Sequence, residues 1–165
     1  MEYMSGGSLR DLIKKFGPFE ECLIKNYLKQ CLMALKYLHS KGIIYKNFFA
    51  SNILVNEFGH IKLCDFTLSE KFNQNNLNLD NYYSNINEEI WSIGRFALEL
   101  HSGKIFCKNY EEFYLKTRNL GDKFYLEDIK DNTSENLRNF IILCLSTYNE
   151  KVVNIDYLLI NPFFD

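Results

Sequence analysis

The stretch that decides the fold reads Ile43-Ile44-Tyr45-Lys46-Asn47-Phe48-Phe49-Ala50-Ser51-Asn52-Ile53-Leu54-Val55 and, six residues later, Lys62-Leu63-Cys64-Asp65-Phe66-Thr67. A polar loop leads into two short apolar runs, and a turn at residues 57–59 joins these runs into a β-hairpin. Such a hairpin holds Asn52 at its mouth and Asp65 at its exit. Carboxylate and amide oxygens brought together in this way suit a hard cation such as Mg2+. We therefore expect a small hairpin over residues 53–63 with a candidate metal site beside it.

The same block resembles the catalytic loop and the magnesium loop of eukaryotic protein kinases. The family pattern is His-Arg-Asp, four residues, Asn, and later Asp-Phe-Gly. This chain reads Tyr45-Lys46-Asn47, four residues, Asn52, and later Asp65-Phe66-Thr67. The resemblance implies ATP with Mg2+ as the cofactor and Asn52 and Asp65 as the metal ligands. It also implies that Asn47, next to Lys46, stands at the position of the catalytic base.

Length and composition indicate one globular domain. The chain has 165 residues, of which 47% are hydrophobic, and its net charge is −2, so it can bury a core. The small net charge gives no support for binding to nucleic acid or to a membrane surface. No apolar run is long enough to span a membrane. Five cysteines without a CxxC pair, and a start without a signal-peptide pattern, favour reduced thiols in the cytoplasm or the nucleus.

Apolar residues recur with the helical period in several segments. We expect long helices over residues 19–40 and 87–100, and shorter helices over residues 8–15, 110–117 and 154–160. Asn132 is expected to cap another helix, with Glu135 as its reciprocal capping partner. The Asn-rich residues 73–78 predict a loop. The predicted fold class is therefore mainly α with one small β-hairpin.

The order of these elements resembles the large, C-terminal lobe of a protein kinase without its N-terminal lobe, over residues 1–165. Residues 1–9, Met-Glu-Tyr-Met-Ser-Gly-Gly-Ser-Leu, resemble the hinge between the two lobes. This resemblance implies three contacts with a nucleotide: Glu2 and Met4 at the adenine edge, Ser8 near the ribose, and Leu54 beneath the adenine ring. Residues 15–20, Lys-Phe-Gly-Pro-Phe-Glu, resemble the STE group, the relatives of mitogen-activated protein kinase kinase kinases.

Several catalytic parts of the family are missing from the sequence. The glycine-rich loop and the phosphate-binding Lys precede the hinge in the family, and no other glycine pattern here could replace the loop. Asn47 stands in place of the Asp that accepts the substrate proton, and losing a general base typically costs about 10²–10⁴ in rate. Lys46 keeps the charge of the usual Arg without its bidentate fork. Tyr45 can fill the volume of the usual His, which predicts retained packing there.

The candidate metal ligands also have local alternatives. Asn52 can bond to the loop backbone, and Asp65 can cap the turn that follows it. Thr67 stands where the family has a Gly, and a β-branched residue is stiff at this position. We therefore expect binding of ATP and Mg2+ to be weak or absent.

The segment between the magnesium loop and the second long helix, about residues 67–88, is far shorter than a usual activation segment. It contains no Ala-Pro-Glu triplet, so we expect the shelf that binds a substrate peptide to be absent. The buried Arg that pairs with that Glu is also missing from residues 144–152, where the matching residue is apolar. Losing both members of a buried ion pair can be neutral, whereas losing one costs about 3–5 kcal/mol. Glu89, in place of the family's Asp, is expected to cap the catalytic-loop backbone.

These residues leave three hypotheses open. The first is a pseudokinase-like module that acts by binding protein, without phosphotransferase activity. The second is an atypical ATP-dependent Ser/Thr protein kinase whose N-terminal lobe lies upstream or in another chain. The third is a degenerate fragment with no selected role, against which the intact helical periodicity counts.

An apolar face is expected where a kinase's small lobe and nucleotide would lie. Its predicted members are Met1, Met4, Ile53, Leu54, Val55 and Phe66. Exposed apolar patches usually mark an interaction site. The face around Met4, Leu54 and Phe66 is therefore predicted to bind a protein partner or a second copy of the chain, unless residues 73–81 fold over it as a lid.

Overall fold

The computed structural model describes residues 4–72, 79–105, 107, 111–112, 115–116, 123–146 and 153–165. Several predictions fall outside these residues: those for Met1 and Glu2, for the loop at 73–78, and for half of the helix at 110–117. In the described parts of the chain, no helix is both long enough and apolar enough to cross a membrane.

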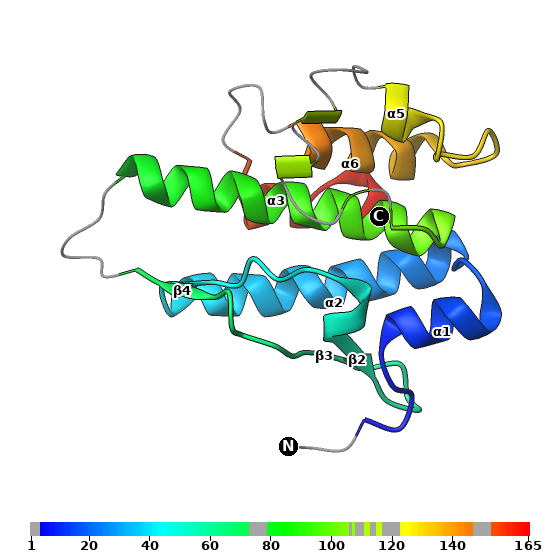
Figure 1. The fold of residues 1–165 in the computed structure, drawn as a ribbon, viewed down its shortest axis with the longest axis horizontal. Helices are drawn as coiled ribbons and strands as arrows, with labels where there is room; N and C mark the ends of the chain where they lie inside the picture. Colours follow the sequence, from blue (N-terminus) through cyan, green and yellow to red (C-terminus); the bar gives the residue numbers. More distant parts are fainter. Residues whose placement is uncertain are drawn as a thin grey trace.

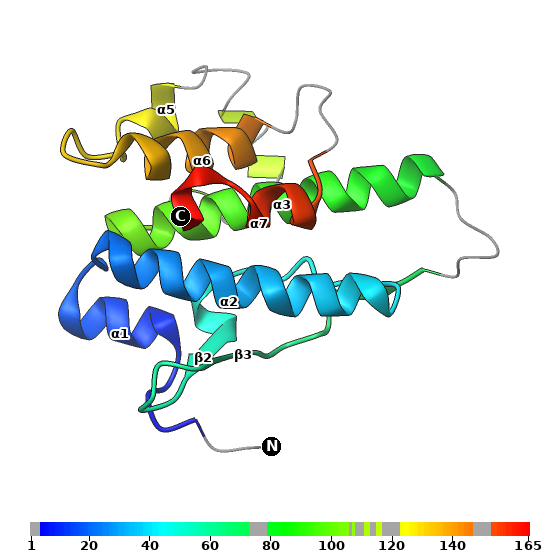
Figure 2. The same cartoon turned by 180° about the vertical axis from the view of Figure 1, so that it is seen from behind.

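Two long helices lie side by side through the centre of the molecule (Figures 1 and 2). Helix α2 spans Glu21–Ser40 and helix α3 spans Leu79–Ser102. The buried residues of α2 follow three- and four-residue steps: Ile24, Tyr27, Leu28, Cys31, Leu32 and Leu35. Residues 89–101 of α3 are buried on every side, as expected for a helix in the middle of a core. Both predicted long helices are confirmed.

Helix α3 begins earlier than predicted, at Leu79 and not at Asn87. Asn is a weak helix former, so the sequence pattern placed the start too late. In the structure, Ile86 is buried, and the ring of Tyr82 packs on Phe72 with centroids 5.5 Å apart. These tertiary contacts support the first turns of the helix despite its asparagines.

The structure has two small antiparallel sheets. The sheet of β2 (Ile53–Val55) and β3 (Ile61–Leu63) lies on the side of α2 away from α3, and the sheet of β1 (Ile43–Ile44) and β4 (Glu70–Lys71) lies near the C-terminal end of α2 (Figure 1). Strands β2 and β3 pair with Leu54 opposite Lys62, which confirms the predicted hairpin. The sheet of β1 and β4 was not predicted, because two-residue strands are too short to show an alternating pattern.

The remaining helices pack around the central pair. Helix α1 spans Leu9–Phe16, and α5 spans Lys123–Leu126. Helix α6 (Glu135–Leu145) packs on α3, and a Cβ added at Gly94 would lie 2.7 Å from the Cβ of Cys144. Any side chain at Gly94 would therefore push these two helices apart. Helix α7 (Ile155–Leu159) and the 3-10 helix η4 (Pro162–Phe164) complete the described chain.

The cap of α6 differs from the prediction. Ser134 is the N-cap residue, and its hydroxyl accepts the Leu137 N–H at 3.2 Å. Asn132, predicted to be the cap, lies two residues earlier and is exposed. The predicted start was too early because Asn132-Thr133-Ser134 contains three residue types that can cap a helix.

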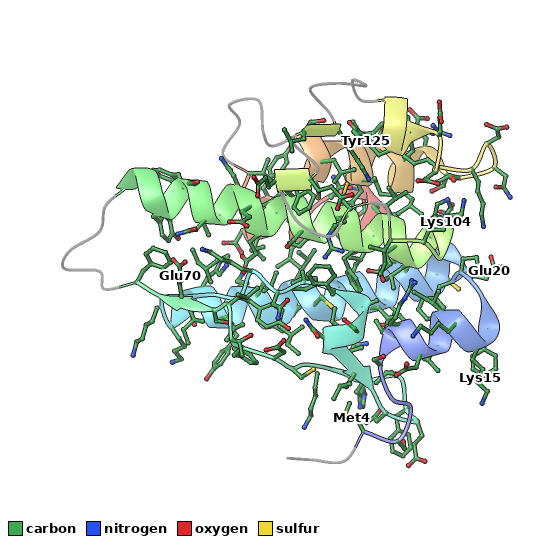
Figure 3. All side chains as sticks on the ribbon, viewed as in Figure 1. Met4, Lys15, Glu20, Glu70, Lys104 and Tyr125 are labelled. Carbon is green, nitrogen blue, oxygen red and sulfur yellow. The ribbon has the colours of Figure 1, made fainter. Side chains whose placement is uncertain are left out.

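The apolar face predicted from the sequence is largely covered. Met4, Ile53 and Val55 are buried, and Leu54 is half-buried. Met4 lies beside the β2–β3 hairpin (Figure 3), and the Gly6 N–H donates to the Val55 carbonyl at 2.9 Å. Of the predicted members that the structure describes, only Phe66 is well exposed. The expectation of one contiguous exposed patch was therefore wrong, because the N-terminal segment packs on β2.

Candidate functional site

Glu89, a fully buried residue of α3, holds the loop between β1 and β2 from its core side. One carboxylate oxygen accepts the Tyr45 N–H at 2.7 Å, and the other lies 2.5 Å from the His39 Nε2. Glu89 therefore ties the loop to both central helices. Its predicted contact with the loop backbone is confirmed.

Tyr45 fills the space beneath the loop. Its ring is buried and packs edge-on against Phe48 and Phe66, with centroid distances of 5.6 and 5.1 Å. Its hydroxyl donates to the Cys64 carbonyl. Burial, reinforced by the nearby Cys64 and Asp65, raises the pKa of the Tyr45 phenol, so the group stays a neutral donor at physiological pH. Tyr45 is therefore a packing residue, as its size predicted.

Asn47, Asn52 and Asp65 come together at the centre of the site. The Asn47 Nδ2 donates to the Asp65 Oδ2 at 2.9 Å and to the Asp65 carbonyl at 3.2 Å. The Asn52 Nδ2 donates in turn to the Asn47 carbonyl at 3.2 Å. Asn47 is buried. An amide at this position thus donates to the neighbouring carboxylate, whereas an ionised carboxylate would repel it.

The other side of Asp65 is also engaged. Its Oδ1 accepts the Thr67 hydroxyl at 2.6 Å and the Thr67 N–H at 3.3 Å. Hydrogen bonds from the Thr67 hydroxyl, from its N–H and from the Asn47 amide lower the pKa of the Asp65 carboxyl. Asp65 has a φ of 56°, which lies in the left-handed region. These bonds hold it in a conformation that a non-glycine residue seldom adopts.

This arrangement fits a magnesium ion poorly. Mg2+ requires six oxygen ligands in a near-octahedral shell and is usually held by one or two carboxylates together with phosphates. Here protein donors already bind both oxygens of Asp65, and Asn52 offers only a neutral amide oxygen. Within the described ranges, no three His, Cys, Asp or Glu side chains gather closely enough to hold a metal ion. The predicted roles of Asn52 and Asp65 as ligands stay predictions.

Lys46 faces away from this cluster, toward β4. Its Nζ lies 2.5 Å from the Glu70 Oε1, and the Asn85 Nδ2 donates to the other Glu70 oxygen at 3.1 Å. Figure 3 places Glu70 at the opposite end of the molecule from Lys15 and Glu20. Lys46 has a φ of 61°, so its backbone is also left-handed. Lys46 thus links the loop to strand β4.

The residues predicted to face a nucleotide have structural partners of their own. The Ser8 hydroxyl caps α1: it donates to the Asp11 Oδ2 at 2.6 Å and accepts the Asp11 N–H at 3.1 Å. Ser8 also forms an isolated β-bridge with Leu54. Met4 is buried, and Glu2 lies outside the described residues. The ribose and adenine contacts predicted for these residues stay predictions.

Arg95, on α3, is a site residue that the sequence reasoning missed. It is 1% exposed, its Nη2 donates to the Phe48 carbonyl, and its guanidinium lies 3.7 Å from the centroid of the Phe49 ring. Its Nε and Nη1 have no hydrogen-bond partner among the described residues. The sequence did contain a signal for this residue, because Arg95 is a charged residue in the otherwise apolar segment of residues 93–98.

Glu99 is the counter-charge of this arginine. Its Oε2 lies 3.8 Å from the Arg95 Nη1, and its Oε1 lies 3.3 Å from the Arg10 Nη1. Burial lowers the pKa of Arg95 to about 10 and raises the pKa of Glu99, so Arg95 is still a cation at neutral pH. The loop therefore rests on a buried charged layer between α1 and α3.

Comparison with known proteins identifies the family. The protein kinase domain model matches residues 1–164. The chain belongs to the protein kinase domain family. Its curated relatives include the mitogen-activated protein kinase kinase kinase YODA of Arabidopsis thaliana, 31% identical over 160 residues. Another is the serine/threonine-protein kinase BCK1/SLK1/SSP31 of Saccharomyces cerevisiae, 32% identical over 186 residues. The chain is thus distantly similar to the STE group, as predicted.

The chain spans only part of these relatives. The YODA match covers 88% of this chain and 18% of that protein, and the BCK1/SLK1/SSP31 match covers 99% and 12%. Among solved structures, Rad53 1–466 in complex with AMP-PNP has a TM-score of 0.75 at 23% identity, covering 100% of this chain and 46% of that one. The Rad53 kinase domain with SCD2 has a TM-score of 0.77 at 25% identity, covering 99% and 63%. The mainly helical kinase-like fold is therefore shown.

Proposed function

We propose that this chain is a kinase-fold module that binds protein and does not transfer phosphate. The observation that carries the proposal is the 2.9 Å hydrogen bond from the Asn47 amide to the Asp65 carboxylate. This hydrogen bond engages the residue at the position of the catalytic base, Asn47, and the residue at the position of a metal ligand, Asp65. Asn47 cannot accept a substrate proton, and Asp65 is held by a protein donor at the oxygen that would otherwise be open to a metal.

Phosphoryl transfer depends on positioning and on electrostatic stabilisation, so each missing part lowers the rate. The kinase family normally binds ATP and Mg2+, and for this chain we infer weak or absent binding. Three features support the inference: the engaged carboxylate of Asp65, the neutral Asn52, and the ion pair that directs Lys46 toward Glu70. The part of the proposal that concerns protein binding is supported by exposed apolar side chains beside the loop, at Phe66 and Leu68.

The direct test is incubation of the purified chain with radiolabelled ATP, Mg2+ and a mixture of generic protein substrates. We expect no incorporation above that of an Asp65→Ala variant, because the base is absent and the carboxylate is engaged. An active Ser/Thr kinase assayed in parallel confirms that the conditions support transfer. Incorporation by the wild type that disappears in the Asp65→Ala variant would overturn the proposal.

A second candidate function is an atypical Ser/Thr kinase that gains its small lobe from elsewhere. The observation that favours it is the preserved loop scaffold, in which Glu89 holds the Tyr45 N–H at 2.7 Å. The same assay, repeated with the longest transcript-supported reading frame around this chain, separates the two. Phosphotransfer by the longer protein that requires Asp65 would favour this candidate.

A further inference from the structure

Three helices meet at His101, which lies in the last turn of α3. Its Nε2 lies 2.8 Å from the hydroxyl of Thr133, the residue before the N-cap of α6. The N-cap residue itself, Ser134, donates its N–H to the Glu21 Oε1 at 2.8 Å. Glu21 is the first residue of α2. The start of α6 is therefore tied to α3 through His101 and to α2 through Glu21.

The hydrogen bond of His101 is buried and its two partners are fixed. His101 is 5% exposed and Thr133 is 9% exposed. The Thr133 N–H donates to the Lys130 carbonyl at 3.1 Å. The Leu100 carbonyl, next to His101, accepts the Phe19 N–H at 2.9 Å. Neither partner can move away from the other without breaking such backbone contacts.

A polar cleft of about 400 Å³ opens at this junction. His101 lines it together with the exposed residues Glu20, Lys130 and Asn132. Figure 3 shows Glu20 and Lys104 at this end of the molecule. Because the cleft is open to solvent, a proton can reach His101 while the rest of the fold stays closed.

The surroundings of His101 disfavour a positive charge on its ring. Lys130 faces it from the segment before α6, Arg138 faces it from α6, and Glu21 faces it from α2. Burial, reinforced by Lys130 and Arg138 and opposed by Glu21, lowers the pKa of His101. The Arg138 Nη2 donates to the Lys130 carbonyl at 3.2 Å, which keeps this cation at the junction.

Other charged side chains near this end of α3 have partners of opposite sign. Arg10 of α1 donates to the Gly103 carbonyl at 3.2 Å and lies 3.3 Å from Glu99. The Lys104 Nζ lies 3.7 Å from the Asp128 Oδ1. These ion pairs leave the charges of the preceding paragraph, with Glu20 at the cleft, as the main ones that the imidazole meets.

We propose that His101 makes the junction of α2, α3 and α6 a pH-sensitive joint, in which protonation of the imidazole releases the start of α6. A neutral imidazole can donate to the Thr133 hydroxyl or accept from it, whereas an imidazolium can only donate. The imidazolium would also place a buried charge beside Lys130. The inference goes beyond the proposed function and does not depend on it.

The direction of the pH effect follows from the lowered pKa. The folded chain favours neutral His101 more strongly than the unfolded chain does. Its contribution to stability is therefore complete above the pKa of histidine in an unfolded chain, about 6.5. That contribution is lost as the pH falls through this value toward the pKa in the folded chain.

The first test is an NMR titration of the His101 ring in the folded chain and in the same chain unfolded by urea. The chain has three histidines, so single His→Gln variants assign the resonances. We expect the His101 midpoint to be lower in the folded chain, and Lys130→Gln to raise it. Lys71→Gln, at an exposed lysine of β4, is the matched control and should leave the midpoint in place. A midpoint at or above the value in urea would overturn the proposal.

The second test is hydrogen exchange of residues 134–138 at about pH 7.5 and about pH 5.5, one unit on either side of the ordinary pKa. After correction for the intrinsic effect of pH, we expect the wild type to lose protection there at the lower pH. His101→Gln keeps a polar side chain beside Thr133 without a titrating charge, so it should show no such loss. His60→Gln, at an exposed histidine, is the control and should behave like the wild type.

Two results of the exchange experiment would overturn the proposal. One is an equal loss of protection in the wild type and in His101→Gln, and the other is a loss that spares residues 134–138. His39 keeps its contact with Glu89 in all these variants, so its titration cancels in the comparison. If His101→Gln does not fold, as circular dichroism would show, the NMR titration of the wild type still decides. Phosphotransfer by the chain would reject the proposed function and leave this inference intact.

Discussion

Asn47 shows how one side chain changes the chemistry of its neighbour. At a position where the family has an Asp, its amide donates to the Asp65 carboxylate at 2.9 Å. Two carboxylates at that separation would repel, and one of them would gain a proton or recruit a cation. With an amide at this position, Asp65 can stay ionised without a bound cation. The same substitution therefore replaces a group that can accept a proton by one that cannot, and it provides a hydrogen bond between the loop and Asp65.

The contribution of Arg95 to stability can be tested by a single substitution. Replacing one member of a buried ion pair leaves the other charge uncompensated, which costs about 3–5 kcal/mol. Because Glu99 keeps Arg10 as a partner at 3.3 Å, we expect Arg95→Met to lower the free energy of unfolding by about 3 kcal/mol, the lower end of that range. Urea unfolding followed by circular dichroism measures the change.

The control for this prediction is Arg10→Met, which removes the half-exposed partner of the same carboxylate. The side chain of Arg10 is 22% exposed, against 1% for Arg95, so water partly screens its charge and this variant should lose less stability than Arg95→Met. The double variant Arg95→Met/Glu99→Gln should be more stable than Arg95→Met alone. Equal losses for Arg95→Met and Arg10→Met would show that the buried layer does not support the loop.

Some residue-level features could be predicted and others could not. The Glu89 contact and the packing role of Tyr45 were correct, because both were inferred from the resemblance of the motifs around residues 45 and 89 to those of the family. The ion pair of Lys46 with Glu70 and the Arg95 contact with the Phe48 carbonyl were missed. Both join residues that are distant in the sequence, and composition alone contains no signal for such pairs.

Among the elements, long helices were predicted well and their ends were not. Helical periodicity identified α2 and α3, but asparagines obscured the start of α3 at Leu79. The strands β1 and β4 pair across a long separation with two residues each, so no local pattern could indicate them. Element ends and short strands depend on tertiary contacts, which here come from Ile86, Tyr82 and Phe72.

The N-cap of α6 gives a prediction at the scale of an element. Ser134→Ala removes the hydroxyl that accepts the Leu137 N–H at 3.2 Å, and loss of such a cap costs about 0.5–2 kcal/mol. Asn132→Ala, at the cap that the sequence suggested, should stay within about 0.5 kcal/mol of the wild type. Thermal unfolding compares the two. A larger loss for Asn132→Ala than for Ser134→Ala would contradict the assigned helix start.

For the whole molecule, the loop from Ile44 to Asn52 is the joint between two parts. The α1 helix and the β2–β3 hairpin pack on one side of α2, and α3 with α6 lies on the other (Figures 1 and 2). Glu89 and Arg95 fasten the loop to α3, while Asn47 fastens it to Asp65 after the hairpin. The predicted apolar face failed at this scale, because residues 4–8 pack on β2, and Met4, Ile53 and Val55 are buried. Global stability therefore reports on the contacts of the loop.

The most direct test of the central claim is the response of thermal stability to Mg2+ in the wild type and in Asn47→Asp. Our account predicts that millimolar Mg2+ leaves the melting temperature of the wild type unchanged, because the Asn47 amide already occupies the Asp65 carboxylate. Asn47→Asp should melt at a lower temperature in EDTA, since two carboxylates then face each other, and Mg2+ should restore much of the loss. A wild-type chain that Mg2+ stabilises as strongly as the variant, or a variant that melts like the wild type in EDTA, would contradict the account.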